Sequence, residues 1–165
     1  MKRLSAGIVL CLAMTGSLAA QMPKYGVTVN TEKGVDFSKF KTYTWTQGQP
    51  SADKTIDAQI TAAVDHQLSA LGMTKAASGT GDVLATYYSV RRTDVDIKAK
   101  PDASGAHPQY PVGTLMVALL EPGTRRRLIR KRIDKPINAS EAGALEATIN
   151  SAVAQLFEKY PTRSK

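Results

Sequence analysis

Cysteine, histidine and aromatic residues are scarce in this chain. Its 165 residues include one Cys, two His, one Trp and three Phe. A single cysteine excludes an internal disulfide and a cysteine-rich metal site. Neither His66 nor His107 has another His, Cys or carboxylate at the spacing of metal ligands, so the sequence predicts no metal site and no cofactor.

Patterns of catalytic residues are also missing. No Ser lies in a nucleophile-elbow pattern, and Gly79-Thr80-Gly81 is only a fragment of a phosphate-binding loop. Asp94 and Asp96 would share one face of a strand, where charged residues more often protect an exposed strand end than catalyse a reaction. We therefore predict no catalytic residues and expect that the protein is not an enzyme.

Long apolar runs are confined to the first residues. Lys2 and Arg3 precede an apolar stretch from Leu4 to Met14, and Ser17-Leu18-Ala19 has small residues at the positions that a signal peptidase reads. The pattern predicts a secretory signal peptide over residues 1–19, because a membrane-spanning helix needs about 20 apolar residues. We expect no transmembrane helix in the mature chain, since no later stretch approaches that length.

Cys11 lies inside this apolar stretch, which raises the alternative of a lipoprotein. Lipid attachment requires a small residue directly before the cysteine, and here Leu10 precedes it. We therefore do not expect a lipid anchor at Cys11. The mature chain, residues 20–165, would form a single domain that is periplasmic or secreted, with contact to the membrane surface as an open alternative.

Basic residues outnumber acidic ones. The chain carries 22 Lys and Arg against 14 Asp and Glu, a net charge of +8. Loss of residues 1–19 would remove two basic residues and leave +6. This excess favours anionic neighbours, although charge alone specifies no partner. Nucleic acid is not expected, because the chain is exported and no aromatic residues alternate with its arginines for base stacking.

The few aromatic residues gather in residues 34–45. Asp36 can cap a tight turn that places Phe37 and Phe40 on one side. The chain then alternates, which predicts a strand with Tyr43 and Trp45 on its inner face. Since large rings contribute most to core burial, we expect a packing centre formed by Phe37, Phe40, Tyr43 and Trp45.

The apolar periodicity predicts two helices. The first begins at Asp53 or Thr55 and ends at Gly72, with Asp65 and His66 on its solvated side. The second begins at a capping box, Asn138-Ala139-Ser140-Glu141, and ends before Pro161.

Five strands are predicted, at residues 25–29, 41–45, 82–90 with an extension toward 97, 113–120 and 125–133. The order β-β-α-β-β-β-α is typical of an α+β fold. We expect a mixed, mainly antiparallel sheet of about five strands, with a parallel pair around the first helix and both helices on one face. The nearly all-apolar strand 113–120 suggests a central strand covered on both faces. A mobile loop is expected near residues 98–112, which contain Pro and Gly.

Residues 36–45, Asp-Phe-Ser-Lys-Phe-Lys-Thr-Tyr-Thr-Trp, resemble the opening signature of a bacterial envelope family, the domain of unknown function 4136. Three later features are similar to that family. They are the first helix with Leu71-Gly72 at its end, Gly81-Asp82-Val83-Leu84 before a strand, and the ending from Ile149 to Phe157 followed by Tyr160-Pro161. The resemblance spans about residues 25–161.

The resemblance implies an exported α+β domain, often lipid-anchored, without assigned catalytic residues. This chain departs from the family pattern because it lacks a suitably placed cysteine for a lipid. It also has Ile129-Arg130-Lys131 at the place where relatives often have a three-residue motif similar to Trp-Arg-Gly. A role tied to that motif does not carry over to this chain.

Arginines concentrate in the last predicted strand. Alternation would place Arg126, Arg130 and Arg132 on one face, and Arg127 and Lys131 on the other. One interpretation is an anion-binding site made of Arg91, Arg92, Arg126, Arg130 and Arg132. The alternative, favoured by the division over two faces, is a solvated edge strand protected by its charge.

The sequence therefore favours a non-catalytic, exported envelope domain that acts as an interaction or structural module toward another envelope protein. The alternative is a module that binds an anionic component through the basic strand. Lipid headgroups, lipopolysaccharide and acidic glycans are the candidate ligands in that case.

Overall fold

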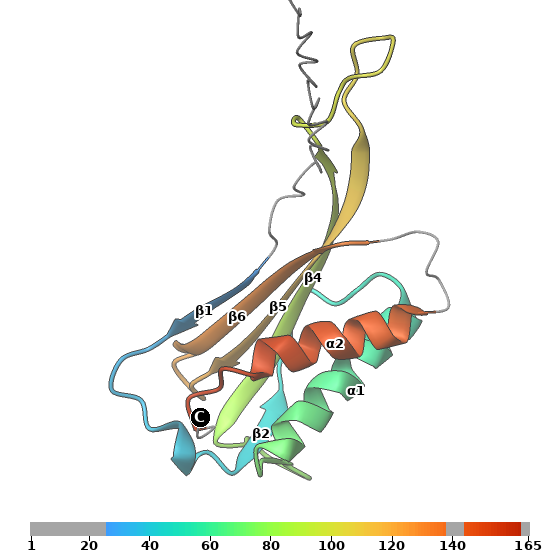
Figure 1. The fold of residues 1–165 in the computed structure, drawn as a ribbon. Coiled ribbons are helices and arrows are strands. Elements are labelled where there is room, and N and C mark those ends of the chain that lie inside the picture. The colour runs from blue at the N-terminus through green and yellow to red at the C-terminus, as the bar shows by residue number, and fades with distance from the viewer. Residues whose placement is uncertain (1–25, 138–143, 163–165) are drawn as a thin grey trace, which may run out of the picture.

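The structure is a computed structural model and describes residues 26–137 and 144–162. In this part of the chain, two helices pack on one face of a six-stranded sheet (Figure 1). The predicted α+β class, the mixed sheet and the placement of both helices on one face are confirmed. The elements are β1 (Val27–Thr31), the 3₁₀ turn η1 (Phe37–Lys39), β2 (Thr42–Trp45), α1 (Lys54–Ala70), β3 (Thr74–Lys75), β4 (Val83–Val95), β5 (Gln109–Leu120), β6 (Arg127–Pro136) and α2 (Leu145–Phe157).

The strand order across the sheet is β1-β6-β5-β4-β2-β3. β2 and β4, which α1 connects along the chain, are parallel, as the crossover rule predicts. The pairs β4–β5, β5–β6 and β1–β6 are antiparallel. The sixth strand, β3, was not predicted. It has two residues, too few to show a period of two in the sequence.

Local signals at both ends fix α1. Oδ1 of Asp53 accepts hydrogen bonds from the backbone N–H groups of Thr55 and Ile56, at 2.8 and 3.3 Å. Gly72 has a φ of +81°, the left-handed conformation in which a helix commonly stops. On the face of α1 that packs in the core, Val64 and Leu68 are fully buried.

The core lies between the sheet and the helices. Phe37 and Tyr43 are buried in it, whereas Phe40 and Trp45 are partly buried at its edge. The rings of Phe37 and Phe40 meet edge to face at 5.7 Å, as do those of Phe37 and Tyr160. The turn after Asp36 therefore joins the start of the chain to the segment that follows α2.

Gly81-Asp82 positions β2 against β4. Oδ2 of Asp82 accepts from the backbone N–H groups of Lys41 and Thr42, at 2.8 and 2.9 Å. A Cβ on Gly81 would lie 2.7 Å from Cα of Tyr43, so a side chain does not fit there. Gly81 and Asp82 directly precede β4, and these contacts hold the start of β4 beside the start of β2.

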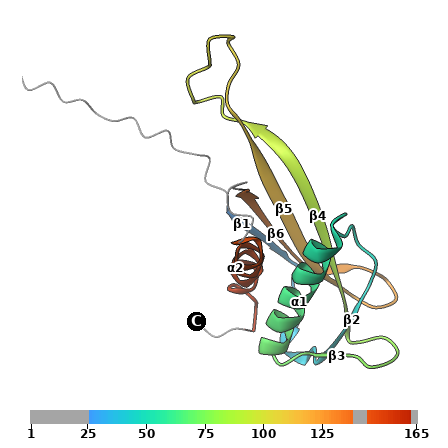
Figure 2. The ribbon, with the colours of Figure 1, turned by 90° about the vertical axis from the view of Figure 1, so that its right-hand side faces the viewer.

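The outer part of the β4–β5 hairpin projects beyond the rest of the molecule (Figures 1 and 2). We call this part, from Val90 to Thr114, the arm; its tip is residues 96–108. β5 begins at Gln109, so residues 109–112 lie in a strand, not in the predicted loop. Pairing with β4 along its whole length extends the strand, an effect that its Pro111 and Gly113 conceal in the sequence.

Two predictions about the sheet were wrong. The basic strand β6 is an interior strand, not an edge, because β1 pairs with it from Val27 opposite Ile133 to Thr31 opposite Ile129. β5 is central but, among the described residues, the helices cover only one of its faces. The other, which we call the open face, carries half-buried Met116 and Leu120. The predicted signal peptide and the capping box at 138–141 lie outside the described residues.

Candidate functional site

The structure separates the five arginines of the predicted anion site. Arg92, Arg130 and Arg132 share the open face, because each lies at an even position in strands whose odd positions face the helices. Arg91 lies on the opposite side of β4. Arg126 precedes β6, in the turn that connects it to β5.

Arg92 lies at the centre of a hydrogen-bonded cluster on the open face. Its Nε donates to Oδ1 of Asp94 at 2.8 Å, and its Nη1 donates to Oδ1 of Asp134 at 2.8 Å and to Oγ1 of Thr114 at 2.6 Å. The hydroxyl of Thr114 also donates to Asp134 at 2.6 Å. Both carboxylates raise the pKa of Arg92 above its usual value, Asp94 more than Asp134.

Arg132 completes this cluster from the other side of Asp134. Its Nε donates to Oδ2 of Asp134, and its Nη2 donates to Oδ1, both at 2.9 Å. Burial alone would raise the pKa of Asp134, but hydrogen bonds from Arg132, Thr114 and Arg92 together hold it well below its usual range. Two arginines and two carboxylates thus neutralise each other at the base of the arm.

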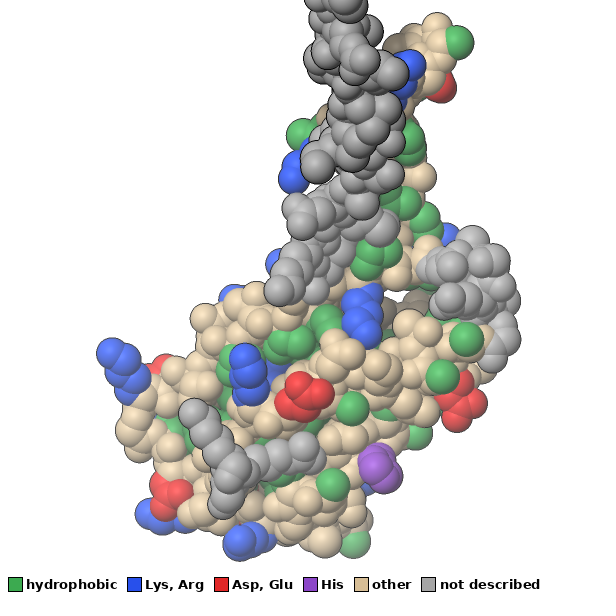
Figure 3. All heavy atoms as spheres, viewed as in Figure 1, with side chains coloured by type: hydrophobic (Ala, Val, Ile, Leu, Met, Phe, Trp, Pro, Cys, Tyr) green, Lys and Arg blue, Asp and Glu red, His purple; other side chains and the backbone are tan. Residues whose placement is uncertain are grey.

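The other three arginines lie outside this cluster. Arg126 pairs with Glu121 at 3.2 Å and with Glu32 at 3.4 Å. Within the described ranges, Arg91 and Arg130 form no ion pair. Lys and Arg side chains are scattered on the face shown in Figure 3, with no single basic patch.

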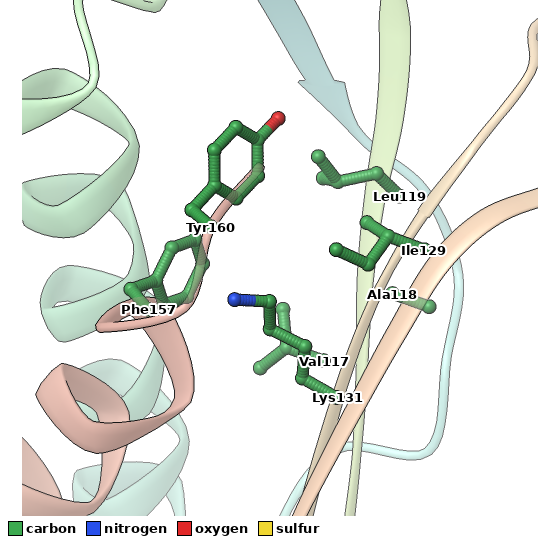
Figure 4. Close-up of a pocket in the computed structure, with 7 residues that line it drawn as sticks. All are labelled: Val117, Ala118, Leu119, Ile129, Lys131, Phe157 and Tyr160. Carbon is green, nitrogen blue, oxygen red and sulfur yellow. The ribbon is translucent and has the colours of Figure 1, made fainter. Parts of the chain in front are cut away.

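Lys131 is a buried cation that the sequence pattern did not reveal. It faces the helices and is only 2% exposed. Its Nζ donates to the carbonyl oxygen of Leu156 at 2.6 Å and lies 5.5 and 5.4 Å from the ring centroids of Phe157 and Tyr160 (Figure 4). In a run of arginines, nothing in the sequence distinguishes this one basic residue as buried.

A small cavity of about 10 Å³ adjoins Lys131, with room for about one water molecule. Aliphatic residues of β5 and β6 line it together with Phe157 and Tyr160, as Figure 4 shows. The hydroxyl of Tyr160 is buried without a hydrogen-bond partner in the described structure, and burial raises its pKa to about 12. This region ties α2 to the sheet and leaves no space for an organic ligand.

Asp65 is not on the solvated side of α1, contrary to expectation. Its Oδ1 accepts hydrogen bonds from the hydroxyl of Tyr43 at 2.8 Å and from Nε1 of Trp45 at 2.7 Å. The hydroxyl of Tyr87 likewise donates to Asp57, which lies nearer the start of α1 than Asp65. Burial, and to a smaller extent this hydrogen bond, raises the pKa of Tyr87 to about 12. Two carboxylates of α1 therefore hold the helix against aromatic residues of the sheet.

Among the described residues, neither histidine belongs to a group of three or more side chains that could hold a metal ion. His66 lines a shallow groove between α1 and α2 with a volume of about 580 Å³. Small residues, including Ala63 and Ala154, also line it. His107 lies in the tip of the arm, where Nδ1 forms a hydrogen bond of 2.9 Å with the carbonyl oxygen of Ala99.

The arm is the part of the described structure that exposes large aliphatic side chains. Val90 is 45% exposed, Val95 is 47% exposed and Ile97 is 76% exposed. Hydrophobic side chains are also visible along the arm in Figure 3. The sequence placed these three residues in a strand over 82–90 and its extension toward 97, and it gave no reason to expect their exposure.

Solved structures with a similar fold come from several bacteria. A PDZ domain protein from Parabacteroides distasonis has a TM-score of 0.61 at 14% identity, covering 86% of this chain and 36% of that one. This chain thus spans 36% of that protein's length. The PelC dodecamer from Paraburkholderia phytofirmans has a TM-score of 0.53 at 10% identity, covering 81% of this chain and 94% of that one. These likenesses show the fold alone.

A family assignment follows from the sequence. Among curated proteins, none matches it. A DUF4136 family protein from Bacteroides thetaiotaomicron shares the fold, with a TM-score of 0.54 at 15% identity, covering 82% of this chain and 95% of that one. The sequence itself matches the family described as a domain of unknown function (DUF4136) over residues 27–162, and the chain therefore belongs to that family.

Proposed function

We propose that the chain is an exported, non-catalytic module of the bacterial cell envelope that contacts another envelope component through the arm. The observation that carries this proposal is the exposure of Val90, Val95 and Ile97 on one projecting hairpin. Contact between aliphatic side chains and water is unfavourable. Exposed aliphatic side chains that gather on one element therefore mark a contact site.

The hydrogen bonds of the tip support a contact role. The backbone N–H of Asp96 donates to the carbonyl oxygen of Pro108 at 2.8 Å, and Asp102 N–H donates to Ala106 at 2.9 Å. Together with the bond between His107 and Ala99, they hold the tip in one shape. A preformed tip loses little conformational entropy on binding.

Export is supported by the signal-peptide pattern in residues 1–19. No helix in the described ranges is long and apolar enough to cross a membrane. PelC, which has a similar fold, forms a dodecamer. We therefore include a second copy of this chain among the envelope components that the arm is proposed to contact.

A non-catalytic role is supported by how the charged residues are used. The carboxylates of the Arg92 cluster and of α1 accept hydrogen bonds from neighbouring side chains. The cavity beside Lys131 is too small for a substrate. Catalysis would require reactive groups converging on an accessible pocket, and these side chains serve packing and register.

A second candidate function is binding of an anionic envelope component on the open face. It is favoured by Arg130, which forms no ion pair among the described residues and lies near the Arg132 side of the cluster. Arg130→Gln should then weaken salt-sensitive binding of anionic lipid or lipopolysaccharide. Equal binding by Arg130→Gln and the original protein would contradict it.

Affinity capture from the native envelope tests the main proposal. The tagged protein and its Ile97→Asp variant are compared, with Ala58→Asp as a matched control at an exposed position on α1. We expect a component that the original protein and Ala58→Asp both retain and that Ile97→Asp loses. Identical recovery of every component by all three proteins would contradict a contact through the arm.

A further inference from the structure

We propose that the tip of the arm enters the headgroup region of a phospholipid bilayer, with Ile97 as the inserted side chain. This inference rests on the proposed function, since it names the component that the arm contacts. Figures 1 and 2 show the tip at the end of a hairpin that projects away from both helices, so it reaches a flat surface before the body does.

The distribution of exposed side chains favours a surface over a folded protein partner. Val90 and Val95 lie on opposite faces of β4, because an even and an odd position of one strand alternate. Val90 and Ile97 are separated by seven residues, which is roughly 20 Å along an extended chain. Ile97 at the tip is therefore separate from the exposed valines, and one side chain offers far less than the roughly 800 Å² that each partner buries in a stable protein interface.

The chemistry of the tip suits the boundary between lipid chains and headgroups. Ile97 is 76% exposed, and the exposed Lys98 and Lys100 follow it closely in the chain. Neither lysine forms an ion pair with a described residue. Long lysine side chains extend toward lipid phosphates while an aliphatic neighbour enters the apolar layer.

The two carboxylates of the tip stabilise its backbone. Oδ1 of Asp96 accepts from the N–H groups of Lys98 and Ala99, at 3.0 and 3.1 Å. Oδ1 of Asp102 accepts from the N–H groups of Ser104 and Ala106, at 2.8 and 3.0 Å. Because two lysines and two aspartates balance in charge, we expect binding to depend strongly on Ile97 and only weakly on the proportion of anionic lipid.

Sedimentation with vesicles of phosphatidylethanolamine and phosphatidylglycerol tests this inference. The original protein should bind, and Ile97→Asp should weaken binding by about tenfold or more, the factor expected from losing one inserted aliphatic side chain. Val90→Asp is the matched control, since Val90 is also an exposed aliphatic residue of the arm but lies at its base. It should bind as the original protein does.

A second variant gives a positive signal. Ile97→Trp should bind at least as tightly, because Trp favours the membrane interface, and its fluorescence should shift to shorter wavelength on addition of vesicles. Trp45 is present in both proteins, so the original protein supplies the background spectrum.

No binding by the original protein, or equal binding by Ile97→Asp, would overturn the inference. A fall in binding of equal size in Val90→Asp would do the same, because it would place the contact along the whole arm. If vesicles fail but position 97 crosslinks to a protein or to a second copy of this chain in intact envelopes, the inference falls and the proposed function stands. Failure of both measurements would contradict both.

Discussion

Nε1 of Trp45 donates a hydrogen bond of 2.7 Å to Oδ1 of Asp65, which joins β2 to the middle of α1. The same oxygen accepts from the hydroxyl of Tyr43. One carboxylate therefore satisfies two donors from the aromatic segment at residues 34–45. This segment holds α1 to the sheet by polar contacts as well as by packing.

Trp45→Ala should lower the free energy of unfolding by about 3 kcal/mol, because it removes a large ring from the edge of the core. Trp45→Phe should cost about 1 kcal/mol, since it keeps an aromatic ring and loses the bond to Asp65. Urea unfolding of both variants and of Asp65→Ala measures these values. If the effects of Trp45→Phe and Asp65→Ala add in the double variant, the two residues are not coupled and the contact does not contribute.

Two tyrosines that differ in hydrogen bonding allow a matched comparison. Tyr43→Phe should lower the free energy of unfolding by about 1 kcal/mol, because its hydroxyl donates to Asp65. Tyr160→Phe should leave stability unchanged or raise it, because the hydroxyl is buried without a partner among the described residues. Thermal or urea unfolding checks both variants. A larger loss in Tyr160→Phe than in Tyr43→Phe would contradict this interpretation of the two hydroxyls.

At Lys131, the size of the side chain should matter more than its charge. Lys131→Met keeps most of the volume and removes a buried ammonium group, so stability should stay within about 1.5 kcal/mol of the original. Lys131→Ala should cost about 2–5 kcal/mol because it enlarges the cavity beside Phe157. Urea unfolding distinguishes the two. Equal losses in both variants would show that the bond to Leu156, not packing, accounts for the contribution.

The cluster at the base of the arm should make stability depend on acid pH. The folded protein holds the pKa of Asp134 below its usual range, whereas an unfolded Asp has a pKa of about 3.9. The contribution of Asp134 is therefore complete above that value and is lost as the pH falls below it. Asp134→Asn should be less stable by about 2 kcal/mol at neutral pH.

Other acidic residues titrate in both the original protein and Asp134→Asn. The effect of Asp134 alone is therefore the difference in free energy of unfolding between these two proteins. That difference in free energy of unfolding should stay constant from neutral pH to about pH 5 and shrink below about pH 4. Denaturant titrations at a series of pH values measure it. A difference that does not change with pH would mean that Asp134 is not stabilised as a carboxylate.

Local signals in the sequence account for much of the fold. Asp53 and Gly72 define α1, and Asp36 defines the turn, because each acts on backbone groups within a few residues. The pairing of β1 with β6 could not be predicted, since it joins segments about a hundred residues apart and the strand Val27–Thr31 has no feature that selects a partner. That pairing decides whether β6 is an edge.

The candidate sites could not be predicted for the same reason, because they depend on contacts between residues that are distant in the sequence. Alternation along the strand predicted that Lys131 and Arg130 lie on opposite faces, but the sequence could not show which of the two faces the helices cover. Asp65 acquires its role from donors that lie 20 and 22 residues away. The exposure of Ile97 results from the length of the hairpin, which pairing between β4 and β5 determines.

Photo-crosslinking in intact envelopes tests the central claim most directly. A photoreactive residue replaces Ile97 at the tip, and in a second protein it replaces Ala58, which is exposed on α1. The arm contact predicts a reproducible crosslink to one envelope component, lipid or protein, from position 97 and not from position 58. No crosslink from position 97, or the same products from both positions, would contradict it.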